Sequence, residues 1–235
     1  MKKILLLVLT SLLFGCATRF KPATVNLSGE TLIFNGDIYR KSADEFLAMI
    51  ATHPVRRVII TSQGGHVGPA LDMAEVIFQK KIDIEVPIIC LSSCANYIFL
   101  AGHNKIISSV GLVGWHGTVT HRKYLDAIGK MPIGKDESSL FDGLPEREEQ
   151  FYQTISTDSF LPWFGKMDPY NVKNFYFLSK EDMELFGVKN IQVRGDYAAS
   201  DLSLLIQTKK VGDYIFIKAD AAVIESIRPL KPALH

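Results

Sequence analysis

A double glycine, a serine pair and a histidine follow three successive apolar runs of the sequence. Gly64-Gly65 comes after the first run, Ser92-Ser93 after the second, and His116 ends the third. Acyl transfer by a serine needs a hydroxyl on a sharp turn, an imidazole to take its proton, and backbone N–H groups that face the developing oxyanion. Glycine suits the last task, because a residue without a Cβ can turn its amide toward a ligand at no steric cost. These residue types are those of a serine hydrolase.

Each of these residues also has an ordinary structural role. Serines before helices are commonly N-caps, so Ser92 or Ser93 would then satisfy the first amides of the helix predicted over residues 94–101. A glycine pair after a strand is commonly a tight turn, and a single histidine is commonly a packed side chain. The three features in this order favour the catalytic interpretation over these alternatives.

Strands and helices alternate around the three features. Apolar runs over residues 55–61 and 84–90 predict strands, and apolar residues at helical spacing over 70–77 predict a helix between them. Repeated strand, helix, strand units with nearly continuous apolar strands predict an α/β fold with a mainly parallel sheet. Such sheets bind ligands at the carboxyl ends of their strands, where the glycine and serine turns lie. Further strands are predicted over 32–34, 189–193 and 214–218, and further helices after Ser42, over 146–155 and after Ser179.

The order Ser62-x-Gly64-Gly65, then Ser93 before an apolar helix that closes in Ala101-Gly102, then His116, resembles the Clp-type serine peptidases and their signal-peptide-peptidase relatives. Both belong to the ClpP/crotonase fold superfamily, which implies a ClpP/crotonase-like fold with a helical arm. The resemblance covers residues 31–191, and its specific part covers 59–116.

The resemblance also implies roles for single residues. Ser93 aligns with the family serine and is therefore the expected nucleophile, with Ser92 as the second choice. His116 is the expected general base, and the N–H groups of Gly65 and Cys94 are the expected oxyanion hole.

The third member of a triad is left open by the sequence. The family has an aspartate shortly before a Phe-Leu-Ser helix start, whereas here Phe177-Leu178-Ser179 follows Asn174 and two aromatic residues. Asp168 and Asn174 are the two candidates to orient His116, because a triad is defined by geometry. A Ser-His dyad and an inactive relative remain alternatives. The inactive protein would be a peptide-binding or assembly module that pairs with an extended peptide. A coenzyme A enzyme of the crotonase type is a weaker third possibility.

The first sixteen residues resemble a bacterial lipoprotein leader. Lys2 and Lys3 precede an apolar run over residues 4–14, which is too short for a membrane span of roughly 20 residues but suits a secretory signal. Leu13-Phe14-Gly15-Cys16 resembles the box whose cysteine is lipidated and becomes the new N-terminus. This implies a signal peptide over 1–15 and a lipid anchor at Cys16. Ala17 resembles the outer-membrane sorting class, with the protein facing the periplasm. An ordinary signal peptide with a chance cysteine is the alternative.

The rest of the chain is long enough for one domain with a sizeable core. We expect a tether over residues 16–26, the domain over 27–220 with an arm over 117–176, and a C-terminal tail over 221–235 that is extended over 228–232. In Clp relatives the arm builds contacts between copies and covers the cleft, so a homo-oligomer is one expectation. The dense aromatic residues of this arm fit an interface, a substrate groove or the core of the domain.

The cysteines suit an oxidising compartment. Once Cys16 is lipidated, Cys90 and Cys94 remain, and two cysteines in an envelope compartment tend to pair. A turn between them brings their Cα atoms within the roughly 4.4 to 6.8 Å that a disulfide needs. We predict a bridge that fixes the nucleophile loop. Two free buried thiols, and Cys94 as the nucleophile, are the alternatives.

Several classes of function have no support in the composition. The chain has 26 basic and 25 acidic residues and no basic stripe, so no nucleic-acid partner is expected. Neither a zinc-binding pattern nor a nucleotide-binding motif is present, so no metal or cofactor is expected. The predicted partners are a peptide or unfolded protein substrate, and the membrane through Cys16. His66 is expected to be solvated, and His121 has no evident partner in the sequence.

Overall fold

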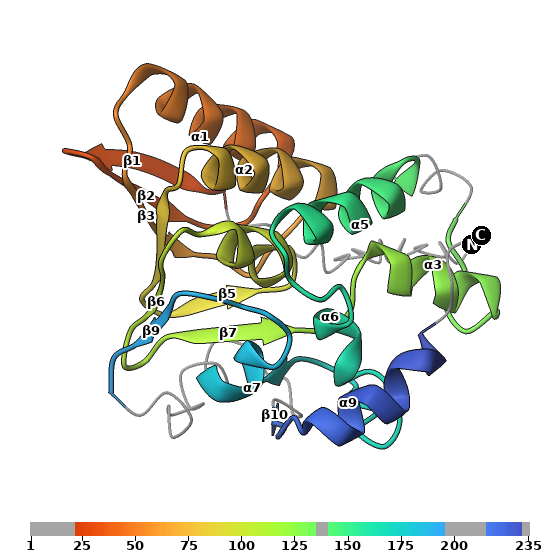
Figure 1. The fold of residues 1–235 in the computed structure, drawn as a ribbon. Helices are drawn as coiled ribbons and strands as arrows, with labels where there is room; N and C mark the ends of the chain where they lie inside the picture. The colour runs from red at the N-terminus through yellow and green to blue at the C-terminus, as the bar shows by residue number, and fades with distance from the viewer. Residues whose placement is uncertain (1–21, 135–140, 196–214, 232–235) are drawn as a thin grey trace, which may run out of the picture.

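The structure is a computed structural model that describes residues 22–134, 141–195 and 215–231 (Figure 1). The predicted signal peptide and Cys16 lie outside the described residues. Within the described ranges, no helix is both long and apolar enough to cross a membrane. The chain folds as an α/β protein with two mixed, mostly parallel sheets, which confirms the predicted class.

Six strands form the larger sheet, in the order β1-β2-β3-β4-β6-β9. Every neighbouring pair is parallel except β1 with β2. In β2 the side chains of Leu32 and Phe34 are buried, and in β3 those of Val58 and Ile60 are buried, each alternating with more exposed residues. This alternation supplies one apolar face to the core. The strands span Thr24–Ser28 (β1), Thr31–Asn35 (β2), Arg57–Thr61 (β3), Asp83–Val86 (β4), Lys105–Ile107 (β6) and Ile191–Val193 (β9).

Two helices that contact each other, α1 (Arg40–Thr52) and α2 (Val67–Gln79), pack beside this sheet (Figure 1). The Ser42 hydroxyl accepts a hydrogen bond from the Tyr39 N–H at 2.9 Å, so Ser42 closes the first turn of α1 from inside the helix. The apolar residues of α2 that recur at helical spacing, from Ala70 to Ile77, are buried. Both helices are confirmed, but the predicted start after Ser42 is wrong, because α1 begins at Arg40 with Tyr39 as its N-cap.

Four strands form the second sheet, in the order β10-β8-β7-β5. β5 and β7 are parallel, β7 and β8 antiparallel, and β8 and β10 parallel. An isolated bridge between Ser62 and Cys90 joins the end of β3 to β5, so the two sheets meet there. The strands span Ile89–Leu91 (β5), Leu112–Trp115 (β7), Tyr176–Phe177 (β8) and Ile215–Phe216 (β10).

The single strand predicted over residues 84–90 is wrong. The chain leaves the larger sheet after Val86 and enters the second sheet at Ile89, so one apolar run supplies strands to both sheets. Pro87 lies in the break, and its missing N–H cannot donate to a sheet ladder. This switch carries the serine turn away from the end of β4 and places it beside β7.

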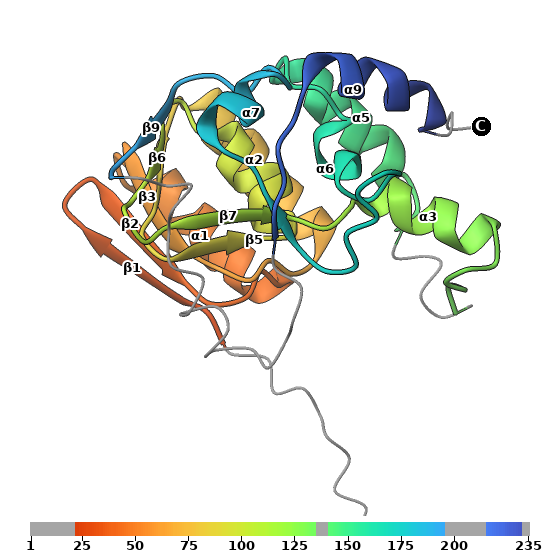
Figure 2. The same ribbon diagram turned by 90° about the horizontal axis from the view of Figure 1, so that it is seen from below.

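The segment predicted as an arm contains helices that differ in burial. α3 lies at the end of the molecule opposite β1 and buries only Val119 and Thr120, whereas α5 and α6 pack into the core (Figure 2). Phe160, Trp163 and Phe164 are almost fully buried, so these aromatic residues fill the core of the domain. The helices span Val119–Ala127 (α3), Leu144–Thr154 (α5), Leu161–Phe164 (α6) and Lys180–Glu184 (α7).

Two predicted boundaries are corrected by the structure. Residues 24–26, assigned to the tether, belong to β1, because Thr24 to Ser28 pair with β2. The C-terminal tail predicted from residue 221 begins with a helix, α9 (Ala221–Ile227), and the part predicted as extended begins with a 3-10 turn, η3 (Arg228–Leu230). The Asp220 carboxylate caps α9 by accepting hydrogen bonds from the first-turn N–H groups, and Ile224 and Ile227 are buried beneath it.

Candidate active site

Ser92 lies on a sharp turn between a strand and a helix. It follows β5 directly and has a φ of 57°, in the left-handed region that few residues other than glycine adopt. The next element is η1 (Cys94–Phe99), a short π-helix. Such a strand-to-helix turn with a left-handed serine holds the hydroxyl out from the backbone, as a nucleophile requires.

The imidazole of His116 meets this hydroxyl. Ser92 Oγ and His116 Nε2 are 2.6 Å apart, which is the distance of a short hydrogen bond. The contact follows from the sheet, because β5 and β7 are parallel and Leu91 pairs with Gly114. The Ser92 N–H also donates to the Gly114 carbonyl at 3.1 Å. Both side chains therefore extend from the same edge, at the carboxyl ends of adjacent strands.

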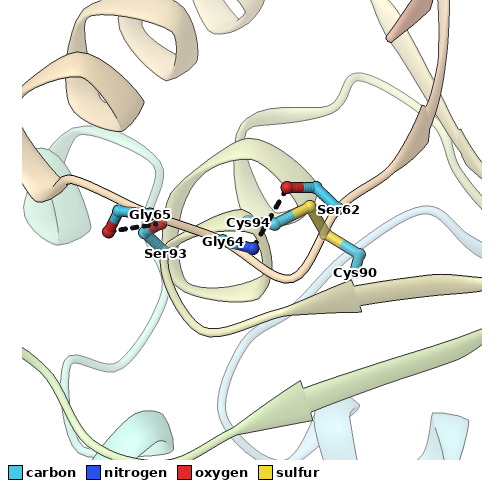
Figure 3. The surroundings of a disulfide bond; sticks show 6 residues. All are labelled: Ser62, Gly64, Gly65, Cys90, Ser93 and Cys94. Carbon is cyan, nitrogen blue, oxygen red and sulfur yellow. Dashed lines mark hydrogen bonds between the residues drawn. A yellow bond between two sulfur atoms is a disulfide. The ribbon is translucent and has the colours of Figure 1, made fainter. Parts of the chain in front are cut away.

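Ser93, the expected nucleophile, has a different place in the structure. Its hydroxyl donates to the Gly65 carbonyl at 3.2 Å, and only 2% of the residue is exposed (Figure 3). The expected pairing of Ser93 with His116 is therefore corrected to Ser92. A π-helix closes its hydrogen bonds at i to i+5, one residue further than an α-helix. The segment predicted as a helix over residues 94–101 therefore begins as a π-helix over Cys94–Phe99.

The double glycine forms the wall opposite the serine turn. A Cβ on Gly64 would lie 2.6 Å from the Leu91 carbonyl oxygen and 2.7 Å from Ser92 Cβ, so only glycine fits against this turn. The Ser62 hydroxyl accepts from the Gly64 N–H at 3.0 Å and holds the loop from its other side (Figure 3). Within the described residues, the N–H groups of Gly65 and Ser93 donate to no acceptor. They are therefore free to bind an oxyanion.

A disulfide joins Cys90 and Cys94, as predicted, with their Cα atoms 5.2 Å apart. Figure 3 shows the bridge beside the glycine loop. Both cysteines are fully buried. The bridge connects β5 to the first residue of η1, so it closes a short loop around Ser92. Because Cys94 is oxidised, it is not a thiol nucleophile.

Of the two residues proposed to orient His116, Asp168 contacts a different side chain, and the backbone carbonyl of Asn174 anchors the segment that reaches the imidazole. The Asp168 carboxylate accepts a hydrogen bond from the side chain of Asn171 and makes no hydrogen bond or ion pair with His116. The Asn174 carbonyl accepts from Lys166 Nζ at 3.0 Å. The ring of Phe175 lies against the imidazole, with centroids 4.6 Å apart. The contact that this segment makes with the imidazole is therefore the aromatic ring of Phe175.

Lys166 holds this segment in place. Its ammonium group donates to three consecutive carbonyls, those of residues 172, 173 and 174, at 2.7 to 3.0 Å. Burial lowers the pKa of Lys166 to about 8. No sequence pattern indicates this role, because the lysine and the carbonyls that it binds lie in a loop without periodicity.

A cavity of about 340 Å³ opens beside Ser92 and His116. Most of its wall is apolar, and among the described residues that line it there is no aspartate or glutamate. Its outer part comes from α3 and the chain that follows α3. The apolar lining residues are Val67, Tyr97, Val119, Leu125, Met131 and Phe141.

A buried polar network lies behind this cavity. Glu148 on α5 is 3% exposed and accepts hydrogen bonds from Tyr97 and from Thr120, the latter at 2.9 Å. Burial raises the pKa of Glu148, although the hydrogen bonds that it receives act in the opposite direction. Sequence reasoning missed this residue. Its spacing to Phe151 and Tyr152 places it on the apolar face of α5, which was the available signal.

Asn96 connects the serine helix to the segment after His116. Its side-chain N–H donates to the Gly117 carbonyl at 2.9 Å, and its backbone carbonyl accepts from the Tyr152 hydroxyl at 3.1 Å. Since Gly117 follows the histidine directly, Asn96 fixes the backbone on which the imidazole is mounted.

Family models and curated proteins were compared with the chain. No family model matches the chain, and no curated protein matches it. Within the described ranges, no cluster of three or more histidine, cysteine, aspartate or glutamate side chains is arranged to hold a metal ion. The site geometry therefore carries the functional argument alone.

Proposed function

We propose that the protein is a serine hydrolase, specifically a peptidase with a ClpP/crotonase-like fold, in which Ser92 is the nucleophile and His116 the general base. The observation that carries this proposal is the 2.6 Å contact between Ser92 Oγ and His116 Nε2, made by a serine on a left-handed turn. The order of glycine turn, serine turn and histidine at the ends of parallel strands supports the proposed fold.

The reaction follows from the positions of these groups. Ser92 Oγ attacks the carbonyl carbon of the scissile bond while His116 Nε2 takes the hydroxyl proton. The N–H groups of Gly65 and Ser93 stabilise the oxyanion; the shift of the nucleophile by one residue replaces Cys94 with Ser93 in this role. The carbon–nitrogen bond then breaks, and the leaving amine takes the proton from His116. Water, deprotonated by His116, hydrolyses the acyl group on Ser92 and restores the enzyme. No step needs a metal or an organic cofactor.

The cavity supports a peptide with an apolar side chain next to the scissile bond. Its wall is built from aliphatic and aromatic groups, and it opens directly beside the Ser92 hydroxyl. We infer that substrates are peptides or unfolded protein segments that reach the site unaided. Nucleic acid is not a proposed partner, and contacts between copies of the chain through the arm remain part of the proposal.

The proposed location is the bacterial cell envelope, with a lipid anchor at Cys16 in the outer membrane facing the periplasm. The Cys90–Cys94 disulfide supports an oxidising compartment, because such bonds persist outside the cytosol. The resemblance of residues 13–16 to a lipoprotein box supports the anchor.

The test is covalent labelling of the purified protein, from Cys16 onward, with an alkyl fluorophosphonate, read by intact mass. We expect one label per chain, and peptide mapping should place it on Ser92. Ser92→Ala and His116→Ala should each lower the labelling rate by at least about a thousandfold, because the groups act as a unit. Ser93→Ala is the matched control and should label within about tenfold of the wild type, since it loses one hydrogen bond.

Labelling of Ser93 in place of Ser92 would contradict the assignment of the nucleophile. A folded wild type that stays unlabelled would instead support the second candidate, a non-catalytic peptide-binding module. One observation favours that candidate: the Asp168 carboxylate contacts Asn171 and not His116.

A further inference from the structure

His121, which had no evident partner in the sequence, lines the cavity beside Ser92 and His116. It lies on the first turns of α3 and is partly buried. Its ring packs edge-on against Trp163, with centroids 4.8 Å apart. Neither ring nitrogen forms a hydrogen bond within the described residues, although the backbone N–H of His121 does. Among the described residues, this polar ring in a mostly apolar cavity has no polar partner.

The ring is held in a fixed position. Gly117 has a φ of 104°, and a Cβ on this residue would collide with His121 Nδ1, so the imidazole lies directly against the Gly117 backbone. The Gly117 carbonyl already accepts from Asn96. Trp163 is fixed in turn by a hydrogen bond from its indole N–H to Thr120 at 3.3 Å. An imidazole packed between a backbone and an indole keeps a defined ring position in the cavity.

The imidazole stays neutral under ordinary conditions. Burial, and in second place the positive charge of Lys166, lowers the pKa of His121 to about 4. A neutral imidazole has one N–H donor and one acceptor. It does not take a proton near neutral pH, which excludes a second general base and leaves hydrogen bonding as its available chemistry.

The surroundings favour an acceptor as the ligand of this N–H. Lys166 contributes a positive potential at the ring, and the guanidinium group of Arg122, which also lines the cavity, donates to the Met131 and Pro132 carbonyls. No aspartate or glutamate is among the described lining residues. A ligand oxygen is therefore better suited to this position than a ligand amine.

We propose that His121 determines specificity by donating a hydrogen bond to an oxygen at the end of an otherwise apolar substrate side chain. The substrate class is a peptide with a glutamine-like or glutamate-like residue before the scissile bond, its methylene groups on the apolar wall and its terminal oxygen at His121. This inference rests on the proposed function, since it assigns the cavity to the acyl side of the substrate.

The experiment uses three peptide phosphonates that react with active serines and differ only in the side chain next to phosphorus: norleucine, glutamine and glutamate. Second-order labelling rates are measured on the wild type and on His121→Phe, which keeps a ring but removes the N–H. We expect the wild type to prefer at least one of the oxygen-bearing probes to norleucine by about 3- to 10-fold, the effect of one hydrogen bond. In His121→Phe the ratio should fall to about one. The choice between glutamine and glutamate reports whether the acceptor is an amide or a carboxylate.

His103→Phe, a histidine outside this cavity, is the matched control and should keep the wild-type ratio. His121→Leu replaces His121→Phe if the larger ring prevents folding. A wild type without preference, or a preference that survives in the His121 variant, would overturn the proposal.

The two proposals fail in different ways. If the alkyl fluorophosphonate labels Ser92 but the phosphonates show no dependence on His121, only the specificity claim is lost. If nothing labels Ser92, the hydrolase claim is lost, and affinities of the corresponding peptides for wild type and His121→Phe decide the role of His121. A lower affinity for the oxygen-bearing peptide in the variant would support it, and equal affinities would overturn it.

Discussion

The two halves of the candidate site are held by different kinds of interaction. On the serine side, Ser92 lies inside a disulfide-closed loop whose cysteines are fully buried, and the glycine loop packs directly against it. On the histidine side, His116 is exposed and is followed by a helix with little burial of its own. Backbone and covalent constraints fix the nucleophile, whereas separate side-chain contacts fix the base. A single change on the serine side should therefore lower stability and the labelling rate strongly. Each single change on the histidine side should lower them less.

Glu148 is the strongest exception to this contrast, because it serves both sides. It accepts from Tyr97 on the serine helix and from Thr120 near the start of α3. We expect Glu148→Ala to lower the free energy of unfolding by about 3 kcal/mol, since two buried hydroxyl groups lose their acceptor. Urea unfolding followed by circular dichroism measures this. Glu148→Gln keeps an acceptor oxygen and is the control. If it lowers the free energy of unfolding as much as Glu148→Ala does, the negative charge is needed.

The disulfide tests the serine side alone. Changing both Cys90 and Cys94 to alanine should cost about 2 kcal/mol of stability, because the closed loop is short. Fluorophosphonate labelling should slow by about tenfold, since the left-handed turn at Ser92 persists only while the surrounding structure fixes it. Reduction of the wild type with dithiothreitol is the independent comparison. Labelling that stays at the wild-type rate in a folded variant would show that the hydrogen bonds at Ser92 and Ser93 fix the turn without the bridge.

Much of the serine side could be predicted from the sequence, and the reasons are local. Two cysteines four residues apart predicted the disulfide, and the apolar spacing from Ala70 to Ile77 predicted α2. The choice between Ser92 and Ser93 could not be made in this way. It depends on the left-handed backbone at Ser92 and on the pairing of Leu91 with Gly114, a contact between strands that are distant in the sequence.

The histidine side was less predictable because its contacts come from distant parts of the chain. Glu148 is one of several glutamates in its helix, and only its burial distinguishes it. Phe175 reaches His116 because Lys166 gathers the carbonyls before it, a contact between loops that no pattern indicates. The break between β4 and β5 differs from these contacts, because Pro87 marks it in the sequence, although the sequence does not show that the two strands join different sheets.

The pH dependence of stability tests whether α3 holds the ring of His121 in a buried position near His116. The folded-state pKa of His121 is about 4, against 6.5 for the free side chain, so the unfolded chain binds a proton first as the pH falls. The contribution of His121 to the free energy of unfolding is therefore constant above pH 6.5 and is lost as the pH falls from 6.5 to 4. Relative to His121→Phe, the wild type should lose about 1 to 2 kcal/mol over this window, after allowance for partial exposure. Urea midpoints at pH 7 and pH 4.5 measure the difference; an equal change in both proteins would contradict the burial of this ring.

Phe175→Leu should give the smallest effect and the sharpest test of the contrast between the two sides. Leucine keeps the apolar volume but removes the flat ring that lies 4.6 Å from the imidazole, an aromatic contact of about 1 kcal/mol. The stability loss should stay below about 1 kcal/mol, while labelling at Ser92 should slow by about 3- to 5-fold, because the imidazole has more orientations and fewer of them face Oγ. Phe78→Leu, on the exposed face of α2, should leave the labelling rate unchanged. If the Phe175 variant labels at the wild-type rate, Phe175 does not orient His116. The Asn96–Gly117 hydrogen bond would then be the contact that orients it, and Asn96→Ala should slow the labelling of Ser92.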